Sequence, residues 1–328
     1  MKSLKFSVII FAVLLSIYLI IPTGCNNSKS RTGNDSLHGS ITISGAFALY
    51  PMASKWAQEY MKLHPDVKID ISAGGAGKGM ADVLSNMVDI AMVSRDVTQE
   101  EINKGAWYIS VTKDAVLASV NKNNPYLEEL KKKGLTREIF KDIYVTGKIK
   151  DWGTALGKGK AEGINIFTRS DACGAAEIWA KFLGVKQENL KGVGVFGDPG
   201  IAQAVQNDKL GLGYNNVIYL YDIKTHKPVE GLAAIPIDID NNGRIDSYEN
   251  FYENLDSISN AIMTGRYPSP PARELFFVSK GEPQKPIVKA FLRWILTEGQ
   301  SYVKEAGYVK ISDKRINEEL KKLDGNKE

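Results

Sequence analysis

The chain has 328 residues, of which 43% are hydrophobic and 24% are charged. This is the composition of an ordinary globular protein, with enough length for two domains. The formal net charge is only +4 and the sequence contains no dense basic tract, which excludes nucleic acid as the expected partner.

The first residues are typical of an export signal, which we predict to span residues 1–24. Two early lysines precede an unbroken apolar run at residues 6–21. A small residue before Cys25 resembles a bacterial lipoprotein cleavage site, at which this cysteine is lipidated, although Pro22 stands where leucine is usual. The alternative is an uncleaved membrane anchor, and either one places the rest of the chain outside the cytoplasmic membrane. Residues 25–38 are polar and lack periodicity, which predicts a flexible tether.

Strands and helices alternate along the next part of the chain. Residues 41–44 predict a strand, and a helix with an apolar face begins near Pro51. A second strand is predicted at residues 67–71, a helix from Met80, and an apolar strand at residues 89–93. This alternation predicts a mostly parallel sheet covered on both faces, with ligands at the carboxyl ends of its strands.

Four glycines occur where the second strand turns into a helix, within residues 72–80. The backbone there can fold tightly and point free N–H groups outward, and the helix dipole adds positive character. The turn is therefore either an anion site or a tight turn without a ligand. The sequence excludes a nucleotide loop, because Gly79 follows Gly77-Lys78 where serine or threonine is needed, and Met80 occupies the last glycine position of the Rossmann pattern.

The second half of the chain repeats this arrangement. A helix is predicted at residues 136–145, a strand at residues 164–167, a turn at residues 168–174, and a further helix after that turn. Arg169 lies in that turn, and a guanidinium combined with helix N–H groups makes a stronger oxyanion site than either does alone. The alternative is a surface Arg169 paired locally with Asp171.

Further short strands are predicted at residues 212–214 and 233–236, and a long amphipathic helix around residues 287–295. Two apolar runs, at residues 116–120 and 275–278, are candidates for the two connections between the domains.

The run from Asp238 to Glu249 fits the EF-hand calcium loop pattern throughout, with Gly243 at its sharp turn. The predicted ligands are Asp238, Asp240, Asn242, Arg244 through its carbonyl, Asp246, and Glu249. Calcium requires about six to eight oxygens, and this loop can supply them. We predict a structural calcium site. The alternative is a solvated acidic turn, and the single loop has no clear helix pair of the kind a calcium sensor would need.

Several motifs together resemble the phosphate-binding proteins of phosphate ABC transporters. In chain order they are residues 44–51, the glycine turn, residues 88–95, residues 142–152, residues 169–171, residues 211–214 and residues 280–283. The similarity runs from about residue 40 to about residue 311, and the most specific motif ends in Asp151-Trp152.

The resemblance implies the α/β fold of type II periplasmic binding proteins, in which two lobes close on a dehydrated oxyanion. The first lobe would take residues 39–119 and 273–328, and the second residues 120–272. The resemblance also implies a ligand cleft lined by Ala48, Leu49, Tyr50, Gly74, Gly75, Gly77, Ser94, Arg169, Cys173, Gly174 and Ala175.

The cleft residues depart from the family pattern, which usually places hydroxyls in all three turns. The residues standing there are Ala48 and Leu49, Ala73 and Gly74, and Cys173 and Ala175. Ser94 replaces the carboxylate that accepts the proton of hydrogen phosphate, with Asp96 close by. Each lost neutral hydrogen bond weakens binding by about 0.5–1.5 kcal/mol. The sequence therefore leaves phosphate, arsenate, sulfate, a tungstate-like ion and a phosphorylated small molecule open.

We predict an extracytoplasmic, monomeric solute-binding lipoprotein that passes phosphate or a similar oxyanion to an ABC permease, which must supply the ATP hydrolysis. One alternative is a surface sensor or scaffold that kept the fold and lost transport. The other is an enzyme with Cys173 as nucleophile. We predict no enzyme, because the three histidines, His38, His64 and His226, lie in no recognisable base arrangement.

Overall fold

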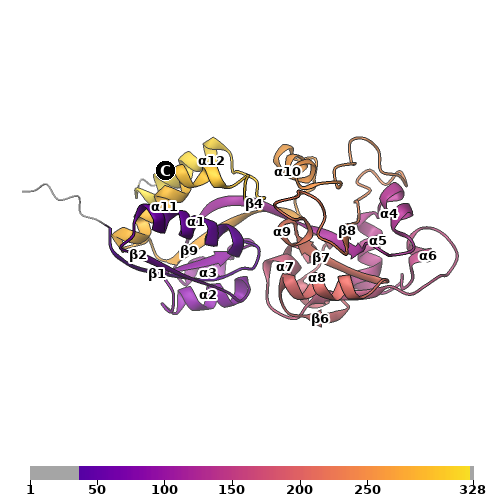
Figure 1. Ribbon diagram of the computed structural model, residues 1–328. Coiled ribbons are helices and arrows are strands. Elements are labelled where there is room, and N and C mark those ends of the chain that lie inside the picture. The colour runs from indigo at the N-terminus through magenta and orange to yellow at the C-terminus, as the bar shows by residue number, and fades with distance from the viewer. Residues whose placement is uncertain (1–36, 326–328) are drawn as a thin grey trace, which may run out of the picture. The chain divides into compact units, whose positions relative to one another are not determined.

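The computed structural model describes residues 37–325. Within this range nine strands form a sheet in the order β2-β1-β3-β9-β4-β7-β5-β6, and β8 also pairs with β4 (Figure 1). The strands are β1 (Gly39–Gly45), β2 (Val67–Ala73), β3 (Ile90–Val93), β4 (Ala106–Asn121), β5 (Asn165–Arg169), β6 (Val193–Val195), β7 (Gly211–Asn216), β8 (Leu232–Ala234) and β9 (Ala272–Lys280).

Helices connect most of these strands. The α-helices are α1 (Tyr50–Leu63), α2 (Ala76–Leu84), α3 (Gln99–Asn103), α4 (Leu127–Lys133), α5 (Arg137–Lys141), α6 (Trp152–Ala155), α7 (Gly174–Leu183), α8 (Gly197–Asn207), α9 (Val217–Leu220), α10 (Leu255–Thr264), α11 (Pro286–Leu296) and α12 (Asp313–Leu323). A π-helical turn spans Asp142–Thr146, and 3-10 turns span Gln187–Asn189 and Glu298–Tyr302. In the described part of the chain, no helix has the length and apolarity needed to span a membrane.

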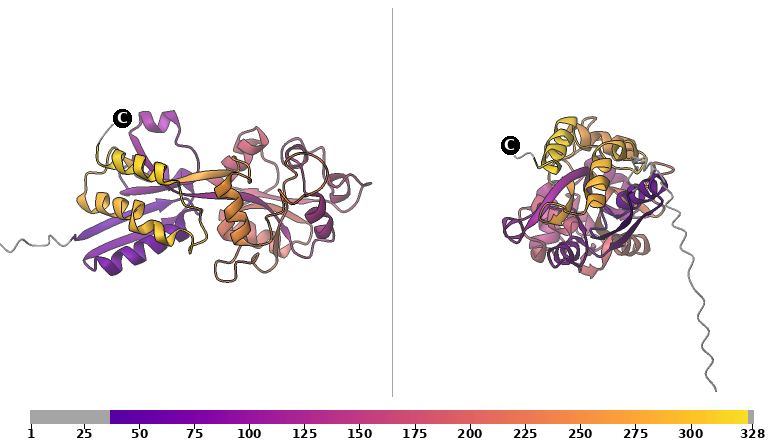
Figure 2. Two further views of the ribbon diagram at one scale, coloured as in Figure 1. Left: turned by 90° about the horizontal axis from the view of Figure 1, so that it is seen from above. Right: turned by 90° about the vertical axis from the view of Figure 1, so that its left-hand side faces the viewer.

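The first of two hydrophobic clusters is built from residues 41–111 and 275–323. Helix α1 packs its apolar stripe into this cluster, as the i, i+3, i+4 spacing predicts. Its Trp56 is fully buried and donates its indole N–H to the Gly299 carbonyl at 2.8 Å. The same cluster holds α11, which packs against α12 (Figure 2). The core of the first cluster is therefore completed by the end of the chain.

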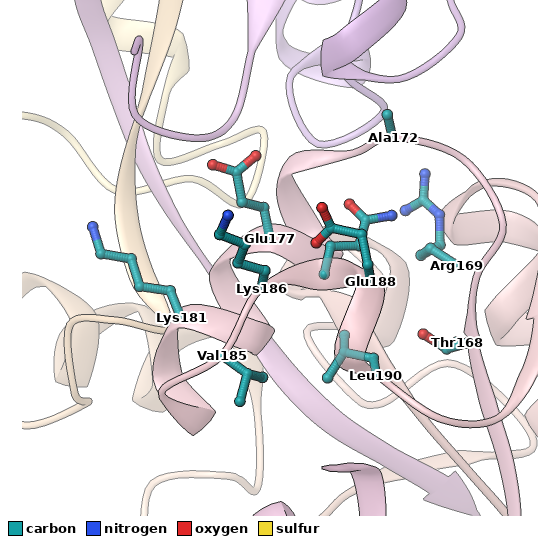
Figure 3. Close-up of a pocket in the computed structure, with 10 residues that line it drawn as sticks. Thr168, Arg169, Ala172, Glu177, Lys181, Val185, Lys186, Glu188 and Leu190 are labelled. Carbon is teal, nitrogen blue, oxygen red and sulfur yellow. The ribbon is translucent and has the colours of Figure 1, made fainter. Parts of the chain in front are cut away.

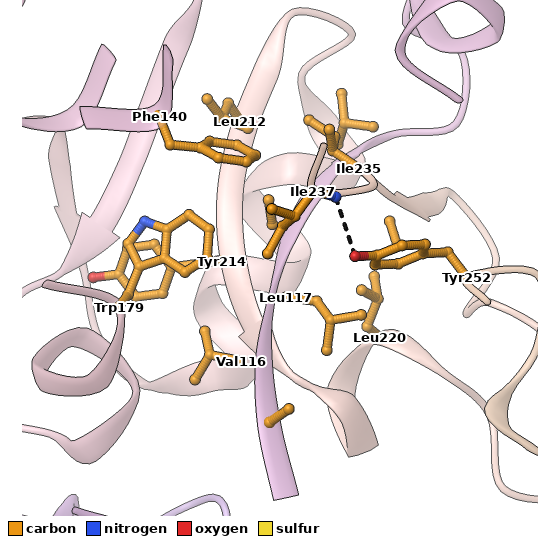
Figure 4. Packing of buried hydrophobic residues seen from close by; sticks show 14 of the residues in the cluster. Val116, Leu117, Phe140, Trp179, Leu212, Tyr214, Leu220, Ile235, Ile237 and Tyr252 are labelled. Carbon is orange, nitrogen blue, oxygen red and sulfur yellow. Dashed lines mark hydrogen bonds between the residues drawn. The ribbon is translucent and has the colours of Figure 1, made fainter. Parts of the chain in front are cut away.

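The second hydrophobic cluster is built from residues 115–272 together with Val309. Trp179 of α7 is fully buried in it, stacked on Tyr214 and edge-on to Phe140 (Figure 4). A hydrogen bond of 3.1 Å from the Ile237 amide to the Tyr252 hydroxyl crosses the cluster (Figure 4). Each buried hydroxyl and amide that pairs in this way avoids the cost of an unsatisfied polar group.

Strands β4 and β9 join the two clusters, and the predicted connections at residues 116–120 and 275–278 lie on these strands, just after the points at which each strand changes cluster. They pair antiparallel along residues 106–115 and 272–280, and β4 continues until it pairs with β7 and β8. The cluster changes between Val111 and Ala115 on β4 and between Ala272 and Leu275 on β9. The predicted lobe limits, at residues 119 and 273, lie near these positions. The predicted signal peptide, Cys25 and nearly all of the predicted tether lie outside the described residues.

The predicted mostly parallel sheet is wrong where the clusters meet. Strands β1, β2 and β3 are parallel, as are β5, β6 and β7, but β9 is antiparallel to β3 and β4. The reason is that β4 runs from the first cluster into the second and β9 runs back from the second into the first, so the two paired strands point in opposite directions.

The helix predicted at residues 136–145 is shorter than expected. Thr136 caps it as predicted, with its side chain accepting from the Ile139 amide, but α5 ends at Lys141 and a π-helical turn follows. That turn contains the β-branched Ile143, and Gly147 stops it with a φ of +71°. β-Branched residues lose side-chain freedom in a helix and so weaken its continuation.

Candidate functional site

The parallel register of the first three strands places their ends at one edge of the sheet. Gly45 of β1 lies beside Ala73 of β2 and beside Met92 of β3. The turns that follow these strands, together with Ser94 after β3, are therefore neighbours, as expected for a ligand edge in an α/β sheet.

The glycine turn of the first cluster contacts the arginine turn of the second. The Gly77 amide donates to the Ala172 carbonyl at 3.2 Å. A Cβ on Gly75 would lie 2.9 Å from the Asp171 Oδ2, and a Cβ on Gly174 would lie 2.2 Å from the Ser94 Oγ. Such distances leave no room for a side chain, so glycine is required by the close approach of the two turns.

Arg169 is buried at this junction and is held by two carboxylates. Its Nε and Nη2 donate to the two oxygens of Asp171 at 2.8 and 2.6 Å, and its Nη1 donates to Asp198 at 2.5 Å. Burial opposes the charge, but Asp198 and Asp171 outweigh it and raise the pKa of Arg169 above its ordinary value. The alternative of a surface arginine is therefore wrong, although the local pair with Asp171 exists.

A guanidinium has five N–H bonds, and these contacts use three of them. Arg169 keeps two further donors for an anion, in a position where water is largely excluded. The Phe47 ring covers the guanidinium at 5.5 Å from its centroid, a cation–π contact that fixes the orientation of the arginine.

Several amides in the turns expected to line the cleft are already used inside the protein. The Gly74 and Gly75 amides both donate to the Gly45 carbonyl, at 2.9 and 3.0 Å. The Leu49 and Tyr50 amides donate at 3.1 and 3.2 Å to a carbonyl in their own turn. The prediction of free N–H groups is therefore wrong for Gly74 and Gly75, because the tightness that glycine permits brings both amides back onto a carbonyl of the neighbouring strand. The amides of Leu49 and Tyr50, which the resemblance placed in the cleft lining, are likewise already used.

The first turn of α7 keeps donors of the predicted kind. Gly174 and Ala175 are its first two residues, where N–H groups have no acceptor within the helix. The Cys173 Sγ caps the helix by accepting from the Ala176 amide at 3.4 Å. Ser94 is 2% exposed and faces Gly174, so its hydroxyl lies beside the same helix end. In the turn after β1, the predicted residues Ala48 and Leu49 are buried and Tyr50 is exposed.

Asp198 and Phe47 are site residues that the sequence analysis missed. Asp198 lies 29 positions after Arg169, in α8, and no local pattern connects the two. Phe47 is an aromatic residue in a strand-end turn, next to predicted site residues, and that placement was an available signal. Its carbonyl accepts from the Tyr219 hydroxyl at 3.0 Å, a second contact between the two clusters.

A pocket of about 740 Å³ adjoins Arg169 on the side of α7 (Figure 3). Arg169 and Ala172 lie at one end of it, and its polar lining carries both signs of charge, from Glu177, Lys181 and others. Of the predicted ligand residues only Arg169 lines this pocket. It is therefore a separate hollow beside the guanidinium and does not coincide with the predicted cleft.

The thiol of Cys173 is buried, and burial raises its pKa to about 12 although Arg169 opposes the shift. Nucleophilic cysteines need the thiolate near neutral pH. We expect Cys173 to remain unmodified by iodoacetamide at pH 7.5 in the folded protein and to react fully after unfolding in guanidinium chloride, as measured by mass spectrometry. Rapid alkylation of the folded protein would contradict the buried thiol and would reopen the enzyme alternative.

The chain matches the PBP superfamily domain over residues 30–298. It is 25% identical over 323 residues to the phosphate-binding protein PstS of Bacillus subtilis, covering 95% of this chain and 97% of that protein. It is 26% identical over 327 residues to PstS of Staphylococcus epidermidis, covering 97% of this chain and 93% of that protein. The crystal structure of a putative phosphate ABC transporter substrate-binding protein from Clostridium perfringens, with bound phosphate, aligns with a TM-score of 0.69 and 26% identity, covering 84% of this chain and all of that one.

The chain therefore belongs to the PBP superfamily, and its fold is that of the type II periplasmic binding proteins. It is a binding protein and not an enzyme, since the family and the relatives described above are those of solute-binding proteins.

Proposed function

We propose that the protein captures phosphate outside the cytoplasmic membrane and delivers it to an ABC permease. The observation that carries the proposal is Arg169, buried where the two clusters meet and left with two N–H donors after its carboxylate contacts. The names of the PstS relatives and of the phosphate-bound neighbour point to the same ligand.

The proposed binding set combines Arg169, the α7 amides of Gly174 and Ala175, and the Ser94 hydroxyl. Helix N-termini favour anions because their amides and dipole are positive at that end. The Gly77 amide, which donates to the Ala172 carbonyl, joins the set when an anion oxygen replaces that carbonyl. Gly74, Gly75, Leu49, Tyr50, Ala48 and Cys173 then shape the walls of the site and are not its donors.

Asp171 offers the proton acceptor that is missing at Ser94. Its Oδ2 accepts from Arg169 at 2.6 Å and faces Gly75 at the junction of the two turns. Phosphate carries at least one proton near neutral pH and can donate it to a carboxylate, whereas sulfate carries none and is repelled. This argument favours phosphate over sulfate and over other fully deprotonated oxyanions.

We expect wild-type protein to bind phosphate about 100-fold or more tightly than sulfate, and Asp171→Asn to narrow that ratio by about tenfold, since an unmatched buried polar contact costs about 1–3 kcal/mol. Isothermal titration calorimetry of both anions measures the ratio. Asp66→Asn, at an exposed carboxylate just before β2 and at the opposite end of that strand from the glycine turn, is the matched control and should leave the ratio unchanged. Equal affinities for the two anions in wild type would contradict the acceptor role, and binding of neither anion would favour the sensor or scaffold alternative.

The proposal also includes attachment of the protein to the membrane by a lipid. Cys25 would carry lipid after removal of residues 1–24, and residues 25–38 would link the lipid to the folded part. The protein would act as a monomer tethered outside the cytoplasmic membrane, with the permease as its partner.

A further inference from the structure

We propose that the loop from Asp238 to Glu249 is a structural calcium site that stabilises this loop against the end of α4 in the second cluster. The loop lies between β8 and α10, in a segment with no other regular structure. Carboxylate oxygens of Asp238, Asp240 and Glu249 all lie within 4.8 Å of one another. Oxygen ligands converging from positions one, three and twelve of a twelve-residue loop are the arrangement that calcium occupies in an EF-hand.

The burial of Glu249 and the unpaired state of one of its oxygens are a second observation, separate from the proximity of the three carboxylates. The residue is only 2% exposed, and its Oε2 has no hydrogen-bond partner. Its Oε1 accepts from the Ile239 and Asp240 amides at 2.6 and 3.3 Å, so the side chain is held in place with one oxygen unpaired. A buried carboxylate oxygen without a partner is costly unless a cation or a donor satisfies it.

The first position of the loop is preorganised in the same way. Asp238 is 2% exposed, and its two oxygens accept from the Asn242 and Gly243 amides at 3.1 and 2.9 Å. Gly243 has a φ of +79°, the conformation that the sharp turn of the loop requires. The remaining predicted ligands, Asn242, Arg244 through its carbonyl, and Asp246, follow in the positions that the pattern assigns to them.

The charges around the loop are uncompensated by side chains. Among residues 37–325 no lysine or arginine forms a salt bridge with Asp238, Asp240 or Glu249 within 4.0 Å. Three carboxylates at such short separations repel one another, and a divalent cation removes that repulsion. Calcium fits better than magnesium, because the loop supplies many protein oxygens in a flexible ring, whereas magnesium keeps several waters in a strict octahedron.

The loop is hydrogen-bonded at its first position and near its middle to the last turn of α4 and the residues just after it. The Asp238 amide donates to the Leu135 carbonyl at 3.2 Å, and the Ile245 amide donates to the Lys132 carbonyl at 2.7 Å. Fixing the loop with an ion would therefore also fix the end of α4 against it. The role is structural, and the site uses none of the proposed anion-binding residues, so the two proposals stand or fall separately.

Calcium titration of the chelator-treated full chain tests the site. We expect about one equivalent of calcium by isothermal titration calorimetry, and a melting temperature that rises by about 5 °C when calcium exceeds its dissociation constant about 100-fold. Magnesium at equal concentration should give a clearly smaller rise. The absence of calcium binding, or an equal response to magnesium, would overturn the proposal.

Glu249→Gln gives a more specific test, because it separates the effect of calcium binding from the effect of the substitution on the stability of the calcium-free protein. In chelator the variant should melt at or above the wild-type temperature, since it removes a buried unpaired charge. In calcium it should show no further rise. Glu253→Gln, at an exposed carboxylate four residues beyond the loop, is the matched control and should keep the full calcium response. A calcium response retained in Glu249→Gln, or lost in Glu253→Gln, would contradict the assignment.

Discussion

Arg169→Ala is expected to weaken phosphate binding by at least about 30-fold, because truncating a buried charged partner of a ligand costs about 2–5 kcal/mol. Two effects act together. The variant loses the two remaining guanidinium donors, and it leaves the Asp171 and Asp198 carboxylates without their counter-charge beside the incoming anion. Isothermal titration calorimetry with phosphate measures the change.

The same change lowers stability, because breaking a buried ion pair costs about 3–5 kcal/mol. A variant that combines Arg169→Met with Asp171→Asn and Asp198→Asn removes the unpaired charges. It should melt at a higher temperature than Arg169→Ala, and it should still fail to bind phosphate tightly. Arg293→Ala, at a surface ion pair with Asp324, should leave binding unchanged. Near-normal affinity in the folded triple variant would exclude Arg169 from the site.

Gly174→Ala is expected to weaken phosphate binding by about 10- to 100-fold while each cluster stays folded, since overpacking costs about 1–3 kcal/mol. An added Cβ would lie 2.2 Å from the Ser94 Oγ and 2.3 and 2.6 Å from its backbone O and C, which cannot move aside like a flexible side chain. Ser94 follows β3 in the first cluster, whereas Gly174 begins α7 in the second. The two clusters must move apart to relieve the clash.

Small-angle X-ray scattering with and without phosphate distinguishes this effect from a local loss of a donor. Gly174→Ala should remain in a more extended form at phosphate concentrations that compact the wild type. Gly159→Ala is the matched control, because a Cβ on Gly159 meets no atom within 4 Å. Unchanged affinity in Gly174→Ala would show that the close approach to Ser94 is not needed for binding.

Local patterns in the sequence were sufficient for most of the fold. The i, i+3, i+4 spacing around Trp56 predicted α1, and the alternation at residues 67–71 predicted β2. Both patterns reflect which side chains are buried, and the spacing of the buried side chains determines whether a segment forms a helix or a strand. The direction of β9 was missed, because the orientation of a strand depends on where the chain returns from and leaves no trace in the strand itself.

The site was predictable only in part, for a related reason. The turn sequences and the family resemblance placed Arg169, Gly75 and Gly174, which the structure brings together at one junction. The partners of each amide could not be predicted, because a tight turn supplies its own acceptor, as the Gly45 carbonyl does. Asp198 could not be predicted either, since its contact with Arg169 exists only after α8 has packed beside β5.

The division of the two hydrophobic clusters along the chain has a consequence for the order of folding. The second cluster comes almost wholly from residues 115–272, so it can form as soon as that stretch is available. The first cluster draws on residues 41–111 and 275–323, and it needs β9 and α11 to enclose β1 and β3. Closing a loop of that length is slow and entropically costly. The amino-terminal strands therefore remain without a complete core until nearly the whole chain has been made, although they come first in the sequence.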